Sequence, residues 1–225
     1  MKYEVPYITL YGVDILEPFT VLTDLLIAAV CFYAYAKLRN EKYKNSVYTF
    51  FRIFFFMMGL ATIVGGILGH GFYYVWQMEG KIPGWYLSMI SVAAFERGAI
   101  LHAKPLLKNR IGNFFAVLNI VELLTFMTLT FIIVKFIFVE IHAMYGLLVV
   151  VFSFELFVLL KTKDEGSKWM MYGVFWAAVS AILHFFRVSL HEWFNYNDIA
   201  HLGMAFAVWC FYKGVTKMKI HRHVN

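Results

Sequence analysis

The sequence is poor in charged residues, cysteine and proline, and each shortage excludes a class of protein. Only 15% of its 225 residues are charged, whereas soluble globular chains carry about 25%. The two cysteines, Cys31 and Cys210, both lie in apolar runs, which argues against a disulfide-stapled domain. With 4 prolines and no low-complexity tract, the chain is neither collagen-like nor a disordered polymer.

Hydrophobic residues, by contrast, are in excess. They make up 61% of the chain, and the mean hydropathy is +0.68, whereas ordinary soluble chains are about 45–50% apolar. A soluble core of this size cannot hide so much apolar surface, so we expect lipid to be the main solvent. The composition therefore predicts an integral, multi-pass membrane protein.

Seven apolar stretches are each close to the ~20 residues that a helix needs to cross a bilayer. Continuous runs of this length predict helices, because the backbone of a spanning segment must satisfy its own hydrogen bonds. The stretches cover roughly residues 16–37, 48–75, 85–103, 113–136, 141–161, 169–190 and 196–213. Short loops, such as the Gly- and Pro-containing segment 80–84, join them. We predict one all-α domain over residues 1–225, a bundle of seven transmembrane helices.

The basic residues predict the orientation of this bundle. The loops after spans one, three and five share a side with the C-terminal tail, and this side carries most of the 20 Lys and Arg residues. The other side carries only Lys2 and Lys81. The positive-inside rule then places the N-terminus outside and the C-terminus in the cytoplasm. The net charge of +6 is explained by anionic lipid, so we expect no nucleic-acid partner.

Ionisable residues inside the spans are costly in hydrocarbon and mark candidate sites. At ~1.5 Å of rise per helical residue, five of them lie at a similar depth near the outer ends of four spans. They are Asp24, His70, His184, Asp198 and His201. Imidazole and carboxylate groups suit Zn²⁺, and three protein ligands plus a water form the catalytic arrangement.

One interpretation of this outer layer is a zinc site. Asp198 and His201 are three residues apart and share a helix face, and His70 would complete the set of three ligands. His184 is a possible replacement or fourth ligand, and Asp24 or His184 would orient a ligand or act as a general base. In the alternative interpretation, these side chains bond to backbone or to one another and hold helices together.

A second polar group lies deeper, towards the cytoplasm. It comprises Glu96, Arg97, Glu122 and Glu155, and Arg52 could join it. Buried charges survive by pairing, which favours ion pairs between helices. A path for protons or ions is the other interpretation.

Three short motifs resemble the CREST superfamily of seven-helix membrane hydrolases, and its alkaline ceramidases most closely. Residues 17–24 begin with a Glu and reach Asp24 where the ceramidases have Asn. Residues 64–70 share the glycine-rich turn and the zinc-binding histidine, His70, with Gly66 in place of a Ser. Residues 197–201 keep the second histidine of a His-x-x-x-His motif as His201, and Asp198 lies one position after the place of the first.

The resemblance implies a zinc-dependent hydrolase that cleaves an amide or ester bond of a membrane lipid. His70, Asp198 and His201 would bind the zinc ion, and the lipid would enter sideways from the outer leaflet. The rival hypothesis is a non-enzymatic seven-helix protein, namely a transporter, a sensor or a lipid-binding protein with the same polar layer. The sequence does not indicate an oligomeric state.

The orientation leads to the first testable prediction. We expect a reporter enzyme fused after Asn225 to be active in the cytoplasm, because the basic loops share the side of the C-terminus. Paired fusions of a cytoplasm-active and an export-active reporter would measure this. Activity of the export-active fusion alone would contradict the predicted orientation.

Overall fold

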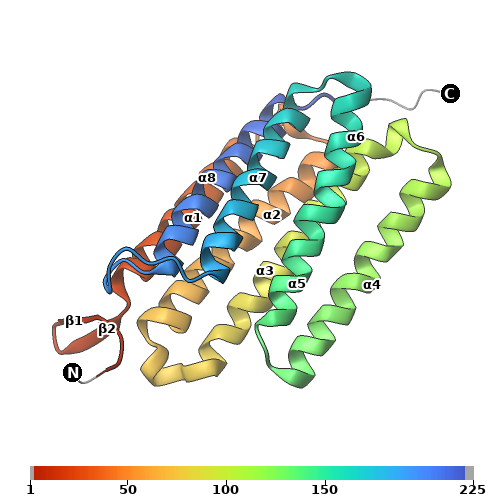
Figure 1. Cartoon of the computed structure of the whole chain (residues 1–225). Coiled ribbons are helices and arrows are strands. Elements are labelled where there is room, and N and C mark those ends of the chain that lie inside the picture. Colours follow the sequence, from red (N-terminus) through yellow and green to blue (C-terminus); the bar gives the residue numbers. More distant parts are fainter. Residues whose placement is uncertain (1–2, 221–225) are drawn as a thin grey trace.

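Seven long helices run up and down through the molecule, and a β-hairpin precedes them (Figure 1). The structure is a computed structural model that describes residues 3–220. The hairpin is formed by β1 (Tyr7–Leu10) and β2 (Val13–Leu16), which pair antiparallel. Two of the long helices contain a π-helical stretch, so that α2 continues into η2, and α5 continues through η4 into α6.

The helical elements have the following bounds in chain order. They are α1 (Pro18–Lys37), η1 (Glu41–Tyr43), α2 (Ser46–Val64), η2 (Gly65–Gly71), α3 (Tyr73–Ala103), η3 (Lys104–Leu106), α4 (Asn109–Ile133), α5 (Ile137–Met144), η4 (Tyr145–Val151), α6 (Phe152–Thr162), α7 (Glu165–Phe185) and α8 (Tyr196–Lys217).

Four of the long helices are apolar enough over a sufficient length to cross a membrane. They are α1, α2 with η2, α4, and α5 with η4 and α6. This suggests an integral multi-pass membrane protein, as the composition predicted. The helix α8 packs against both α1 and α7, while α4 lies at the edge of the bundle against α3 and α5 (Figure 1). The predicted orientation of the bundle stays a prediction.

The segment 80–84, predicted to be a loop, is instead part of α3. The chain breaks earlier, at Gln77, where φ is 48°, and Pro83 lies in the helix that follows. The two glycines of the segment serve close packing rather than a turn. A Cβ at Gly80 would lie 2.8 Å from the carbonyl oxygen of Leu68, and one at Gly84 would lie 3.2 Å from that of Ala61.

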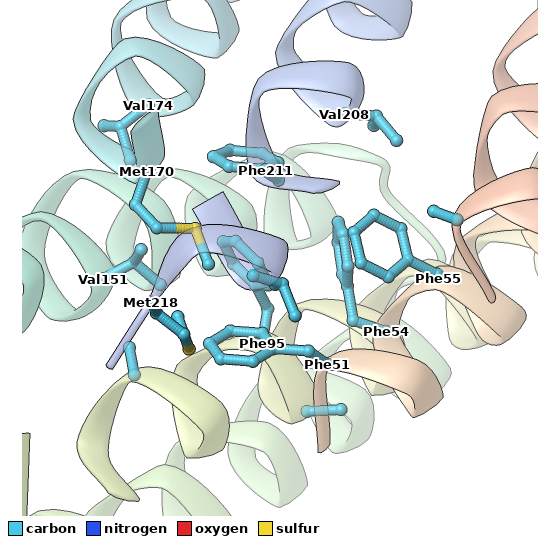
Figure 2. Close-up of a cluster of buried hydrophobic side chains, with 14 of the residues drawn as sticks. Phe51, Phe54, Phe55, Phe95, Val151, Met170, Val174, Val208, Phe211 and Met218 are labelled. Carbon is cyan, nitrogen blue, oxygen red and sulfur yellow. The ribbon is translucent and has the colours of Figure 1, made fainter. Parts of the chain in front are cut away.

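Aromatic side chains form the centre of the hydrophobic core, towards the C-terminal end of α8 (Figure 2). The ring of Phe95 lies 4.3 Å from that of Phe54 and 4.5 Å from that of Phe211, measured between centroids. These three residues come from α3, α2 and α8, so the cluster fixes the mutual positions of three helices. The other end of the bundle, beside the hairpin, holds most of the predicted site residues.

We expect Phe95→Ala to destabilise the protein by about 3–5 kcal/mol, because it leaves a cavity in this packed cluster. Phe95 is 0% exposed. A suitable control is Phe131→Ala, since Phe131 is 75% exposed on α4 and faces away from the bundle. Unfolding by SDS titration in mixed micelles measures the difference. Equal effects of the two substitutions would contradict the assigned core.

Candidate functional site

A cavity of about 620 Å³ lies at the hairpin end of the bundle. This volume is within the ~300–1,000 Å³ that is usual for small-molecule sites. Residues from α1, α2, η2, α3, α7 and α8 form its walls, together with the connection between α4 and α5. Its ionisable lining residues are Glu17, Asp24, His70, Lys81, Lys135, His184, Tyr196 and His201.

The structure brings four of the five predicted outer-layer residues to this cavity. They are Asp24, His70, His184 and His201, from four different helical elements. The fifth residue, Asp198, is fully buried and does not line the cavity. Residues that are distant in the sequence therefore line the same cavity.

His70 lies in the π-helical stretch η2 and is held by a carboxylate. Its Nδ1 is 2.8 Å from Oε2 of Glu17. Glu17 joins β2 to α1 with a left-handed φ of 42°, and its backbone N–H donates to the carbonyl of Pro6. Irregular helical turns of this kind are common at functional sites.

The charge state of Glu17 fixes the role of each His70 nitrogen. Burial raises the pKa of the Glu17 carboxyl, but the hydrogen bond and charge of His70 and the charge of Lys81 outweigh it. The pKa is therefore held below its ordinary value of 4.5. An ionised carboxylate only accepts hydrogen bonds, so Nδ1 of His70 donates to it. Nε2 is then the nitrogen of His70 that is left for a ligand.

His201 has a similar arrangement on the opposite wall. Its Nδ1 lies 3.1 Å from Oγ1 of Thr23 and 3.7 Å from Oδ1 of Asp24. The ring centroids of His70 and His201 are 6.3 Å apart. Because both sets of contacts use Nδ1 and both rings line the cavity, Nε2 of each is available there.

Close helix packing positions Asp24. A Cβ built on Gly66 would lie 2.8 Å from Cβ of Asp24. A residue with a side chain at position 66 would therefore displace Asp24. This contact explains why position 66 is occupied by glycine.

Asp198 lies in the first turn of α8, three residues after the N-cap residue Asn195. Its Oδ2 accepts a hydrogen bond of 2.6 Å from the backbone N–H of Asn195, which completes a capping box. Its Oδ1 accepts one of 2.8 Å from the hydroxyl of Thr20 on α1. Both oxygens of Asp198 are thus bonded to groups of α1 and of the α8 cap, and the residue does not line the cavity. Its assignment as a ligand stays a prediction.

His184 reaches the cavity from the end of α7. Its Nδ1 lies 3.7 Å from Oε1 of Glu140 on α5, and its ring centroid is 5.3 Å from that of Tyr196. These contacts orient the ring across the cavity from α1. The predicted role of His184 as a general base or additional ligand stays a prediction.

The inner polar group is not one cluster, as the sequence analysis expected, but two. Glu155 is bonded to Nδ1 of His102 at 3.1 Å and to the hydroxyl of Ser167 at 2.7 Å. Within residues 3–220, Arg97 forms no ion pair with a carboxylate. Its guanidinium donates to the amide oxygen of Asn119 and to a backbone carbonyl. Arg52 bonds to Thr49, within its own helix.

The other half of the inner group contains a histidine that the sequence analysis did not assign to it. Glu96, Glu122 and His142 each offer one ligand atom, and these three atoms lie within 4.8 Å of one another. All three residues are buried. Within the described part of the chain, this group has the geometry to hold a metal ion.

Several residues of both sites carried no role in the sequence analysis. They are Glu17, Lys81, Glu140 and His142. A partner such as Glu17 is 53 positions away from His70, and no local spacing indicates such a pair. Two signals were available: Glu17 begins one of the three motifs, and a buried histidine requires a polar partner.

A family model described as a family of unknown function (DUF6962) matches residues 19–220. The match covers the helices from the second residue of α1 to α8, and both polar groups except Glu17. No curated protein and no solved structure matches the chain.

The lowered pKa of Glu17 leads to a prediction about pH. Its ionised form stabilises the fold above the ordinary pKa of 4.5, and this contribution is lost as the pH falls through the lower folded-state pKa. We expect Glu17→Gln to lower the unfolding temperature near neutral pH, and the difference from wild type to vanish in acid. Glu79→Gln, at an exposed position of α3, is the control. A difference that does not change with pH would contradict the assignment.

Proposed function

We propose that this chain, which belongs to the family of unknown function DUF6962, is a membrane-embedded hydrolase that cleaves an amide or ester bond of a lipid. The observation that carries the proposal is the cavity into which His70, His201 and Asp24 converge from three helices. Imidazole and carboxylate groups that converge in a concave site can bind a metal ion or transfer protons, as hydrolysis requires. All three residues lie in the motifs that resemble the CREST hydrolases, with Asp24 in place of an Asn, and this resemblance supports the same reaction class.

Imidazole is a ligand type that zinc favours. Among the described residues, only Glu96, Glu122 and His142 have three ligand atoms within 4.8 Å of one another, so the outer side chains would have to draw closer around an ion. Metal-binding histidines commonly donate their second ring N–H to a carboxylate, as His70 does to Glu17. His70 and His201 would hold the ion through Nε2, with Asp24, His184 or a rearranged Asp198 as the third ligand. When bound, such an ion lowers the pKa of water and polarises a carbonyl group.

The remaining cavity residues have roles that follow from their positions. Asp24 lies 3.7 Å from His201 and is 5% exposed, so it would either fix that ring or accept a proton from the attacking water. His184 also lines the cavity and would protonate the leaving group. Each role requires a group within hydrogen-bonding reach of the substrate, which the shared cavity provides.

The cavity walls match an amphiphilic substrate. Next to the ionisable groups, apolar side chains complete the lining: Met58, Ala61, Met78, Trp85 and Phe136. A lipid would place its polar linkage beside the histidines and its chain along this apolar wall. Entry from the bilayer would avoid moving the chain through water.

We expect the purified protein in mixed-lipid vesicles to release a fatty acid, detectable by mass spectrometry. Chelator should stop the release and added Zn²⁺ should restore it. Loss of the hydrogen-bonding partner of a metal ligand typically costs roughly 10–100-fold. The rate of the Glu17→Gln variant should fall by a factor in that range, whereas the rates of His70→Ala and His201→Ala should fall further.

The matched control is His191→Ala, because His191 is exposed in the loop before α8 and does not line the cavity. It should retain full activity. Unchanged turnover in the His70 and His201 variants would refute the proposed site. Saturable lipid binding without any product would instead support the rival hypothesis of a lipid-binding protein.

A further inference from the structure

We infer that Glu96 of α3, Glu122 of α4 and His142 of α5 form a second metal site, which binds a divalent first-row transition-metal ion inside the bundle. One ligand atom of each residue lies within 4.8 Å of the others. None of the three lines the cavity of the proposed hydrolase. The inference therefore does not depend on hydrolase activity.

Two carboxylate oxygens of this group are buried without a hydrogen-bond partner. They are Oε1 of Glu96 and Oε2 of Glu122, and the residues are 0% and 8% exposed. Buried polar atoms are nearly always bonded, because an unsatisfied one loses its water without compensation. A cation between the two carboxylates would satisfy both oxygens at once.

The backbone fixes which nitrogen of His142 is free to bind. Nε2 lies 2.9 Å from the carbonyl oxygen of Met89. A carbonyl only accepts hydrogen bonds, so Nε2 carries a proton and Nδ1 is the possible ligand atom. Nδ1 lies 2.6 Å from Oε1 of Glu122, so without metal these two atoms share a proton. A bound ion would take its place between them, and the proton would be released to water. A backbone carbonyl on the opposite ring nitrogen is a common support for metal-binding histidines.

A hydrogen-bonded partner also orients Glu96. The side-chain amide of Asn119 donates to Oε2 of Glu96 at 3.2 Å and to the carbonyl of Ala93 at 3.1 Å. Its amide oxygen accepts from Nε of Arg97 at 3.1 Å. The guanidinium thus contacts the amide rather than the carboxylate, and the charge of Glu96 is left for a cation.

The π-helical stretch η4 leaves space for the group. Gly146 faces Glu96, and a Cβ at this position would lie 2.6 Å from Oε1. Any other residue would fill the space beside the unpaired oxygen. Both π-helical stretches of the fold therefore lie next to a polar group, η2 at His70 and η4 at Glu96.

The charge and the surroundings favour a divalent ion. Two carboxylates and a neutral imidazole carry two negative charges, which such an ion balances. A small apolar cluster around Trp85, Met89 and Val139 lies beside the group, so uncompensated charge there would be costly. Carboxylate and imidazole ligands without thiolate suit Zn²⁺ and Mn²⁺.

We would test the site with Co²⁺ as a coloured probe, on the full chain purified in detergent and stripped with chelator. The background is the His70→Ala/His201→Ala double variant, so that the cavity does not contribute. We expect one equivalent of Co²⁺ to bind, with visible absorption bands that Zn²⁺ abolishes by displacement. Bound metal should also raise the unfolding temperature.

Glu96→Gln and Glu122→Gln remove the charges with little change in shape, and should each weaken binding by at least about 100-fold, the upper end of the cost of losing a supporting group. Glu155→Gln is the matched control, because Glu155 is a buried, histidine-bonded carboxylate whose oxygens both have partners. It should bind Co²⁺ as tightly as the parent.

Zinc-edge X-ray absorption on the double-variant background provides a measurement that needs no change in the site. We expect only nitrogen and oxygen ligands at about 2.0–2.2 Å, including one imidazole. Absence of bound metal, or equal affinity in Glu96→Gln and Glu155→Gln, would overturn the inference. The inference would also be overturned if the Glu96→Gln variant were more stable than its parent and neither bound metal, because protons would then neutralise the carboxylates. If the protein bound Co²⁺ at Glu96, Glu122 and His142 but hydrolysed no lipid, the proposed function would be refuted and the second metal site would stand.

Discussion

The arrangement of this bundle depends on one repeated interaction, a histidine placed against a carboxylate from another part of the chain. Within residues 3–220, five such pairs lie within 4 Å: Glu17 with His70, Asp24 with His201, Glu122 with His142, Glu140 with His184, and Glu155 with His102. In an apolar bundle a lone carboxylate is costly, so each pair also selects which helices become neighbours. Apolar contacts alone would permit many rotations of one helix against another, whereas these pairs permit few.

The pairs differ in whether a ring nitrogen or a carboxylate oxygen is left without a hydrogen-bond partner. This difference distinguishes structural pairs from candidate sites. The carboxylate of Glu155 has His102 and Ser167 as partners, and Nε2 of His102 contacts the carbonyl of Lys219. That cluster is complete. The pairs of His70 and His201 instead leave Nε2 facing a cavity, and the pair of His142 leaves two carboxylate oxygens without partners. Incomplete bonding at a buried position is a cost to folding, which a bound ligand would remove.

The helices could be predicted from the sequence, because long apolar runs leave the backbone no alternative in lipid. That Asp24 and His201 lie at the same end of the bundle could be predicted as well, since it follows from counting residues along a helix. The direction of each side chain could not. Asp198 shares a depth with His201 but turns towards Thr20. The segment 80–84 was misread as a loop because glycine serves both turns and close helix contacts, and only the neighbouring backbone distinguishes the two.

The helix α3 links the two polar groups physically. Trp85 lines the cavity on one side and packs with Met89 and Val139 on the other. The carbonyl of Met89 holds His142, and Glu96 follows two turns later on the same helix. A metal ion bound by Glu96, Glu122 and His142 would fix α3 relative to α4 and α5, and would thereby fix one wall of the cavity. Coupling of this kind requires that the ion favour one position of the helix over another. A lone edge helix such as α4, which has little buried surface of its own, offers the freedom that such an ion would remove.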